Sequence, residues 1–126
     1  MSEFDTNQPI EIIAIGTELV MGRIQDTNSS WLAERMSAAG ANIARISIVG
    51  DGWEELTGAF IEAAARSPYM IVCTGGLGPT SDDRTVEALA SLCGANVVQD
   101  ESTLANYTEK RGVCGVEQLP WHLRKM

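Results

Sequence analysis

YMIVCTGGLGPTSDD, residues 69–83, is the stretch of sequence that decides the fold. Tyr69–Thr74 is a short, nearly continuous apolar run, and three glycines in four positions follow it. Apolar runs of this length suit strands that are covered on both faces, as in a parallel sheet. A buried strand that leads through glycines toward a helix therefore predicts an α/β domain.

Three more stretches have the character of strands. Ile10–Gly16 is an apolar, β-branched run that ends in glycine, and Ala95–Gln99 is a weaker candidate. From Ile43 to Val49 apolar and polar residues alternate, which suggests that one face of this strand is partly exposed to water.

Apolar residues at helical spacing predict helices between and after these strands. The clearest helix includes Leu56 to Ala64, where Asp51 followed by Glu54 resembles a capping box. The others are expected between a cap near Asp26 or Thr27 and Gly40, over Val86–Cys93 before Gly94, and after Asp100 around Leu104 and Tyr107.

Strands and helices thus alternate along the chain with short links. This order predicts an α/β fold with a mostly parallel sheet, helices on both faces in three layers, and right-handed crossovers. A length of 126 residues suits one compact domain, which we expect at 10–126 after a flexible tail at 1–9. Ligands of such sheets bind at the carboxyl ends of the strands.

Charge and cysteine content narrow the classes of partner. The net charge is −8 and no extended basic stripe is present, so nucleic acid is not an expected partner. A phosphate ligand must instead be held by local donors or by a metal. The acidic start does not resemble a signal peptide, and no apolar run is long enough to span a membrane. The three cysteines lack C-x-x-C spacing, so neither a disulfide framework nor a zinc knuckle is expected. Together these features predict a cytoplasmic chain without membrane contact.

The glycine-rich loop is the first candidate binding element. It consists of Thr74, Gly75, Gly76, Leu77, Gly78, Pro79 and Thr80. Its glycines allow positive φ and a close backbone approach, and the helix start behind it offers N–H groups, so the loop suits an oxyanion such as phosphate. It matches neither a P-loop nor the dinucleotide fingerprint. The alternative is a turn that only reverses the chain.

Asp82 and Asp83 follow this loop, in what we expect to be the first turn of the next helix. Carboxylates there interact favourably with the helix dipole, which is a purely structural explanation. Two negative charges would weaken a bare phosphate site, and a bound divalent cation resolves that conflict. We therefore expect a divalent metal at Asp82 and Asp83, with helix capping as the alternative.

Further polar residues are expected at the same edge of the sheet. They are Gly16, Thr17, Glu18, Asp26, Asn28 and Asp51. The three carboxylates among them could bind a ligand or serve only as helix caps, and the sequence leaves both explanations open. The only histidine, His122, lies near the end of the chain, so a Ser-His-Asp or Cys-His catalytic apparatus is not expected.

These motifs, in this order, resemble the N-terminal domain of the CinA family. The resemblance covers roughly Ile10 to Glu109 and rests on Gly16-Thr17-Glu18-Leu19, Gly22-x-Ile24-x-Asp26-Thr27-Asn28, Val49-Gly50-Asp51 and TGGLGPTSDDRT at 74–85. It implies a molybdopterin-binding-like fold similar to that of the MogA and MoaB proteins. It also implies self-association, because relatives of this fold form dimers and trimers.

The same resemblance implies site residues and activities. In MogA-type relatives the Thr-Gly-Gly loop contacts the phosphate region of a pterin, and the two aspartates associated with adenylyl transfer match Asp51 and Asp83. CinA-type domains are associated with a divalent-metal-dependent ADP-ribose pyrophosphatase activity. The diphosphate would then lie on the loop, the metal near Asp82 and Asp83, and Thr85, which completes the motif, would have a supporting role.

Three hypotheses of function remain open at this point. The first is metal-dependent hydrolysis of a nucleotide diphosphate such as ADP-ribose. The second is a domain that binds molybdopterin or a nucleotide without turnover. The third is a domain that folds and does little, because the family usually continues beyond residue 126 and the chain looks shortened.

Overall fold

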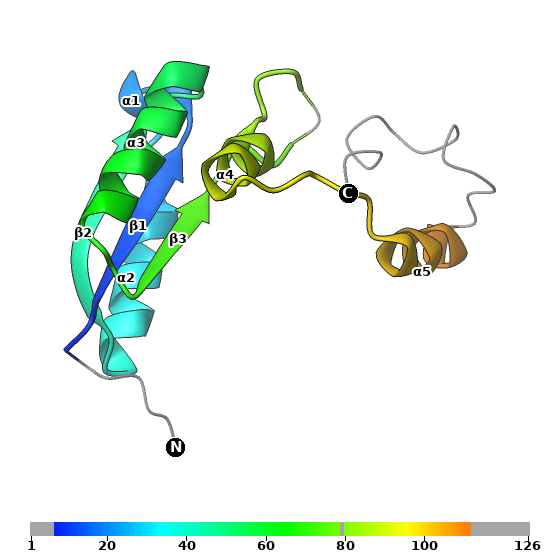
Figure 1. The fold of residues 1–126 in the computed structure, drawn as a ribbon. Helices are drawn as coiled ribbons and strands as arrows, with labels where there is room; N and C mark the ends of the chain where they lie inside the picture. The colour runs from blue at the N-terminus through cyan, green and yellow to red at the C-terminus, as the bar shows by residue number, and fades with distance from the viewer. Residues whose placement is uncertain (1–6, 79, 112–126) are drawn as a thin grey trace.

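The structure, a computed structural model, describes residues 7–78 and 80–111 (Figure 1). In chain order its elements are β1 (Pro9–Ile15), α1 (Thr17–Val20), α2 (Thr27–Ala38), β2 (Asn42–Val49), α3 (Trp53–Ala65), β3 (Met70–Thr74), α4 (Thr85–Cys93) and α5 (Glu101–Arg111). The strands expected at 10–16, 43–49 and 69–74 are all present within a residue or two of the predicted bounds.

The three strands form one parallel sheet in the order β2-β1-β3. The central strand is β1, and Ile12 in it pairs with Ile46 of β2 and with Val72 of β3. From Ile10 to Ile15 every residue of β1 is buried. This burial on both faces is what the apolar sequence of β1 predicts for the middle of a parallel sheet.

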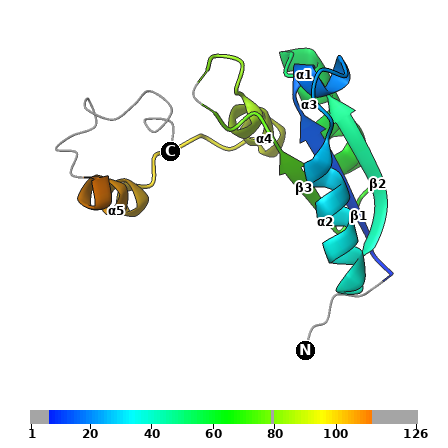
Figure 2. The ribbon, with the colours of Figure 1, turned by 180° about the vertical axis from the view of Figure 1, so that it is seen from behind.

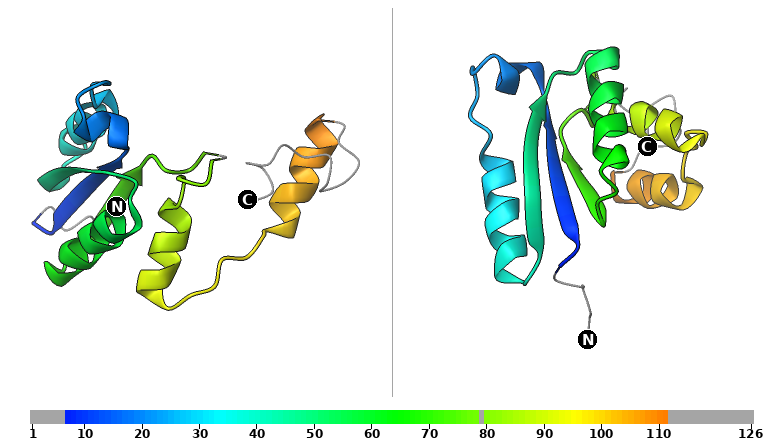
Figure 3. Two further views of the ribbon diagram at one scale, coloured as in Figure 1. Left: turned by 90° about the horizontal axis from the view of Figure 1, so that it is seen from above. Right: turned by 60° about the vertical axis from the view of Figure 1, so that its left-hand side comes forward.

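Helices cover both faces of the sheet, as predicted. In Figure 1, α3 lies in front of the sheet, and α2 comes to the front when the molecule is turned (Figure 2). The two faces are seen edge-on in the right-hand view of Figure 3, and α4 packs against α3. The main core cluster lies between β1, α3 and α4 and consists of Ile13, Ile15, Leu56, Phe60, Ala63 and Ala88.

One expectation about strands is wrong. Ala95–Gln99 forms no strand, and Val97 and Val98 in it are exposed. In β2 one face is exposed to water, as expected, but the exposed face carries Ile46 and Ile48, while Ser47 between them is half-buried. The reason is that β2 forms an edge of this sheet, so its side chains have fewer neighbours than those of β1. The helix expected after Asp100 is present as α5 and lies away from the layered part of the chain (Figure 1).

The helix ends test the predicted caps. Asp26 is the N-cap of α2 and accepts a hydrogen bond from the amide of Ser29, and Gly94 ends α4 in the left-handed conformation, both as predicted. The capping box at Asp51 and Glu54 is wrong, because α3 begins at Trp53, its N-cap is Gly52, and no side chain caps it.

An ion pair that the sequence did not reveal connects β1 to the end of α3 near the amino-terminal end of the sheet. Glu11 of β1 is buried, and its two carboxylate oxygens accept hydrogen bonds of 2.6 and 2.8 Å from Arg66 at the end of α3. The hydrogen bonds from Arg66 hold the pKa of the Glu11 carboxyl below its ordinary value. No helix in 7–78 or 80–111 is long and apolar enough to cross a membrane.

Candidate functional site

The carboxyl ends of all three strands lie at one edge of the sheet, because the strands are parallel. Gly16 follows β1, Gly50 and Asp51 follow β2, and Thr74 ends β3. The amide of Gly16 donates to the carbonyl oxygen of Val49 at 2.9 Å, which keeps β1 and β2 together beyond their last paired residues. The polar residues that the sequence places after the strands therefore lie at the same end of the sheet, as predicted.

The glycine-rich loop that follows β3 needs glycine at its first two positions. Gly75 and Gly76 have φ values of 91° and 67°. A Cβ at Gly75 would lie 2.0 Å from the carbonyl oxygen of Ile15, and one at Gly76 would lie 2.0 Å from Thr85 Oγ1. Positive φ and close backbone approach are thus confirmed. A phosphate on this loop stays a prediction, and Pro79 lies outside the described residues.

Thr85 fixes the loop to the start of α4. Its hydroxyl donates to the carbonyl oxygen of Gly75 at 2.8 Å, and its amide donates to the carbonyl oxygen of Gly76 at 3.2 Å. Thr85 is buried. It therefore acts on the loop through backbone carbonyl groups and sets the shape of the loop.

The two aspartates after the loop do not lie in the first turn of a helix, contrary to expectation. α4 begins at Thr85, so Asp82 and Asp83 precede it. One carboxylate oxygen of Asp83 accepts hydrogen bonds from the amide and the hydroxyl of Thr80, at 2.9 and 2.8 Å. Asp83 therefore folds back onto the end of the glycine-rich loop, and the dipole of α4 does not explain its position.

Asp51 contacts Thr17 across the ends of β1 and β2. The Thr17 hydroxyl donates to Asp51 Oδ1 at 2.7 Å. The sequence left open whether Asp51 caps α3; its carboxylate contacts Thr17, the first residue of α1, instead. Thr17 and Asp51, 34 residues apart in the chain, therefore form one polar pair at the candidate site.

A pocket of about 220 Å³ lies between the ends of β1 and β3. Its walls come from the segment after β1, the start of α2 and the end of β3, and its lining residues are Ile15, Glu18, Leu19, Ile24, Gln25, Asp26, Thr27, Asn28, Thr74 and Gly75. β1 continues to a helix on one face and β3 to a helix on the other, which is the arrangement that opens a crevice in parallel sheets. The same pocket is thus lined by Glu18, Asp26 and Asn28 from one side and by Thr74 and Gly75 from the other.

The predicted residues fall into three groups at the carboxyl end of the sheet. One group lines the pocket between β1 and β3, and a second is the Thr17–Asp51 pair between β1 and β2. The third consists of Asp82, Asp83 and Thr80, which form the outer end of the glycine-rich loop. The structure brings the three groups to the same end of the sheet, and the lining of the pocket between β1 and β3 includes neither Asp51 nor Asp83.

Arg84 was missed by the sequence analysis and connects two of these groups. Its backbone adjoins Thr85 on the β3 side, and its Nη2 donates to the carbonyl oxygen of Asp51 at 3.2 Å. Its guanidinium lies 5.6 Å from the centre of the Trp53 ring, within the range of a cation–π contact. The signal for it was a lone basic residue inside the acidic motif SDDRT.

The residues fit a bound divalent cation only in part. In the segments 7–78 and 80–111, no three His, Cys, Asp or Glu side chains come close enough together to hold a metal ion. Mg²⁺ can be held by one or two carboxylates together with ligand phosphates, which leaves Asp82 and Asp83 as candidates. One oxygen of Asp83 already accepts two hydrogen bonds from Thr80. The protein alone therefore supplies no complete set of metal ligands in the part described.

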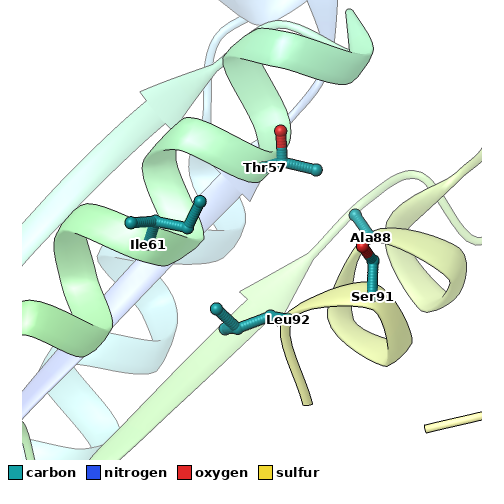
Figure 4. A pocket seen from close by; sticks show the side chains of 5 residues that line it. All are labelled: Thr57, Ile61, Ala88, Ser91 and Leu92. Atoms are coloured by element: carbon teal, nitrogen blue, oxygen red, sulfur yellow. The ribbon is translucent and has the colours of Figure 1, made fainter. Parts of the chain in front are cut away.

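A second hollow and the thiol of Cys73 lie outside the candidate site, and neither supplies a reactive or charged group. A hollow of about 250 Å³ between α3 and α4 is lined by Thr57, Ile61, Ala88, Ser91 and Leu92, without an ionisable side chain (Figure 4). Cys73 packs against the core, and burial raises the pKa of its thiol, which keeps it protonated. Cys73 is therefore a residue of the periphery of the core.

The sequence of the chain is similar to a protein family and to curated proteins of that family. Residues 11–120 match the family model described as a probable molybdopterin binding domain. A CinA-like protein of Akkermansia muciniphila is 43% identical over 107 residues, which are 82% of this chain and 25% of that protein. The chain spans about a quarter of the length of the curated relatives it matches.

Solved structures agree with this placement. The CinA protein of Thermoplasma acidophilum is similar with a TM-score of 0.80 and 31% identity, over 95% of this chain and 69% of that one. The molybdopterin biosynthesis enzyme MoaB of Thermus thermophilus is similar with a TM-score of 0.59 and 27% identity, over 68% of this chain and 54% of that one.

Proposed function

Because the chain belongs to the family of probable molybdopterin-binding domains and is similar to CinA proteins, we propose that it binds a phosphorylated pterin or a nucleotide. The ring would enter the pocket between β1 and β3, and the phosphate would lie on the glycine-rich loop. The observation that carries this proposal is that Glu18 and Asp26 line one pocket together with Thr74 and Gly75, where the loop begins.

The chemistry of the pocket suits a nitrogen-rich ring. The aminopyrimidinone edge of a pterin presents N–H donors, for which the carboxylates of Glu18 and Asp26 are acceptors. Leu19 and Ile24 supply apolar walls for the ring face. A volume of about 220 Å³ lies below the roughly 300–1,000 Å³ of sites that enclose a whole drug-sized ligand, so the phosphate would remain outside, on the loop.

The outer end of the loop affects how a phosphate can be held. Asp83 accepts hydrogen bonds from the amide and the hydroxyl of Thr80. A phosphate at this end of the loop would compete with the Asp83 carboxylate for these two donors. We therefore assign to the loop a binding role in which Asp83 limits the affinity for anions.

The test of the proposed function is binding of neopterin phosphate, a fluorescent phosphorylated pterin, followed by anisotropy. Asp26→Asn keeps an oxygen that can cap α2, because Asn and Asp are similar N-caps, but it removes the charge. We expect binding by the wild-type chain and an affinity about 10-fold lower in Asp26→Asn, since hydrogen bonds to charged groups contribute about 1.5–3 kcal/mol.

The matched control is Asp100→Asn, which changes the residue that accepts from the amide of Thr103 at the start of α5, away from the pocket. Its affinity should equal that of the wild type. Absence of neopterin phosphate binding and of AMP binding by a folded wild-type chain would contradict the proposal.

Hydrolysis of a nucleotide diphosphate such as ADP-ribose is a second candidate, and Asp82 and Asp83 next to the loop are the observation that favours it. It is tested by product analysis with ADP-ribose, with and without a divalent metal. AMP and ribose phosphate that form only with metal, and not with Asp83→Ala, would support hydrolysis. Binding without products, by protein shown to be folded, would leave the domain as a binding module.

A further inference from the structure

A guanidinium group lies across the edge of the sheet where the proposed ligand binds. The backbone of Arg84 adjoins Thr85, whose hydroxyl and amide bond to Gly75 and Gly76 at the end of β3. The far end of its side chain reaches the carbonyl oxygen of Asp51, after β2. Arg84 therefore connects the segment that follows β3 to the segment that follows β2, the two strands on either side of β1.

This guanidinium is held in place but keeps donors to spare. A guanidinium has five N–H donors. Within residues 7–78 and 80–111, Arg84 uses one nitrogen, Nη2, for the bond to Asp51, and its buried Nε has no partner. The stack on Trp53 orients the group without using a donor. Because Nε lies out of contact with solvent, an oxyanion of a ligand would be bound through the terminal nitrogens of the guanidinium.

The charge around Arg84 points to the same role. Its surroundings at the edge are acidic, with Glu18, Asp26, Asp51, Asp82 and Asp83. A phosphate would be repelled by these carboxylates unless a positive charge lies close to it. The arginines of β2, of the end of α2 and of the end of α3 lie elsewhere, and Arg66 among them already pairs with Glu11. Arg23, whose amide bonds to the carbonyl oxygen of Glu18, lies in the segment after β1, next to the pocket-lining residue Ile24. Arg84 supplies a positive charge where the glycine-rich loop meets Asp51.

We propose that Arg84 binds the anionic group of the ligand, with Trp53 and the Asp51 carbonyl group holding its guanidinium in the orientation for binding. This assignment rests on the proposed function and specifies how the phosphate is recognised. It gives the site a planar donor group that suits an oxyanion, and it requires no metal ligand from the protein.

The experiment compares ligand pairs that differ only in the phosphate group. Neopterin phosphate is compared with neopterin, and AMP with adenosine, for binding to the wild-type chain, Arg84→Gln and Arg84→Lys. The matched control is Arg35→Gln, which removes the same charge and a similar stack, since Arg35 lies 5.1 Å from the Trp31 ring on α2. Thermal unfolding of each variant establishes that it is folded.

The expected result is a loss of about 10- to 100-fold in affinity for the phosphorylated ligands in Arg84→Gln, with the unphosphorylated ligands unchanged. Arg84→Lys should recover part of the loss, because it restores the charge but not the planar fork, and Arg35→Gln should behave as the wild type. An equal loss for both members of a pair would overturn the proposal, because Arg84 would then only support the fold of the site. An unchanged affinity would overturn it as well.

A second measurement separates this proposal from the proposed function. In a chain with Trp31→Phe and Trp121→Phe, Trp53 is the remaining tryptophan, and pyrophosphate is titrated while its emission is recorded. If no pterin or nucleotide binds but pyrophosphate changes the emission, and Arg84→Gln abolishes that change, the ligand class is wrong and Arg84 remains the anion-binding residue. If pyrophosphate does not change the emission of Trp53 in the variant that retains Arg84, the assignment of Arg84 is wrong.

Discussion

The hydroxyl of Thr85 donates a hydrogen bond of 2.8 Å to the carbonyl oxygen of Gly75, which joins the first turn of α4 to the first glycine of the loop. Thr85 is buried, and its amide bonds to the next glycine, Gly76. The start of a helix and the end of a strand are thus held in one arrangement by a single residue. The stability of the domain and the shape of the loop should therefore respond together to changes at this position.

Replacement of Thr85 by valine tests this link. Thr85→Val keeps the shape of the side chain but removes the donor, which leaves the carbonyl group of Gly75 without that bond. We expect a loss of about 1–3 kcal/mol in the free energy of unfolding, measured with urea, and weaker ligand binding. Thr57→Val removes a hydroxyl that bonds only to carbonyl groups of its own helix and should lose about 0.5 kcal/mol or less. Equal losses at both positions would argue against a special role for Thr85.

Alanine substitution of the loop glycines should separate steric conflict from backbone strain. Gly75→Ala places a methyl group against the backbone of Ile15, and no side chain there can move aside. Gly22 also has a positive φ, of 72°, but a Cβ there would meet no atom within 4 Å. Gly22→Ala should therefore lose only the roughly 1–2 kcal/mol of a left-handed alanine. We expect Gly75→Ala to lose clearly more in thermal unfolding, and a similar loss in the two variants would contradict the close approach to Ile15.

The role of Asp51 can be distinguished from helix capping by stability. No side chain caps α3, and Asp51 bonds to Thr17 at an exposed position. Asp51→Ala should therefore change the free energy of unfolding by about 0.5 kcal/mol or less. Asp26→Ala, which removes the side-chain cap of α2, should lose about 1 kcal/mol. If chemical denaturation shows the larger loss for Asp51→Ala, the original capping interpretation would be restored.

The Glu11–Arg66 ion pair predicts how stability changes with pH. The pKa of Glu11 is lower in the folded protein than its ordinary value of 4.5, because Arg66 bonds to the charged form. The stabilisation by this group is therefore complete above pH 4.5 and is lost as the pH falls through the folded pKa. The wild type should lose more stability than Glu11→Gln between pH 6 and the acid transition, about where carboxylates titrate. Parallel pH profiles of the two proteins would show that the pair contributes nothing to this dependence.

Much of the local structure was predictable because it depends on residues close in sequence. The apolar runs of β1 and β3 require burial, the Asp26 side chain reaches the amide of Ser29 three residues on, and Gly75 and Gly76 allow a conformation that other residues avoid. At Asp51 a local pattern allowed two outcomes, and the contact with Thr17, 34 residues away in the chain, decided between them. Ala95–Gln99 has a strand-like pattern, but among the described residues it pairs with no strand, and its valines are exposed.

The sequence by itself determined a parallel α/β domain and the chemical character of its edge, with a glycine-rich loop and several carboxylates after the strands. The tertiary structure decided which of these residues meet. The sheet order β2-β1-β3 places Thr17 against Asp51 and opens the pocket that Asp26 and Thr74 line. It also brings Arg84, which follows β3, to the carbonyl group of Asp51, which follows β2. The physical reason is that helix and strand formation follow from neighbours in the chain, whereas contacts between strand ends depend on the path of the crossovers and the packing of the helices on the sheet.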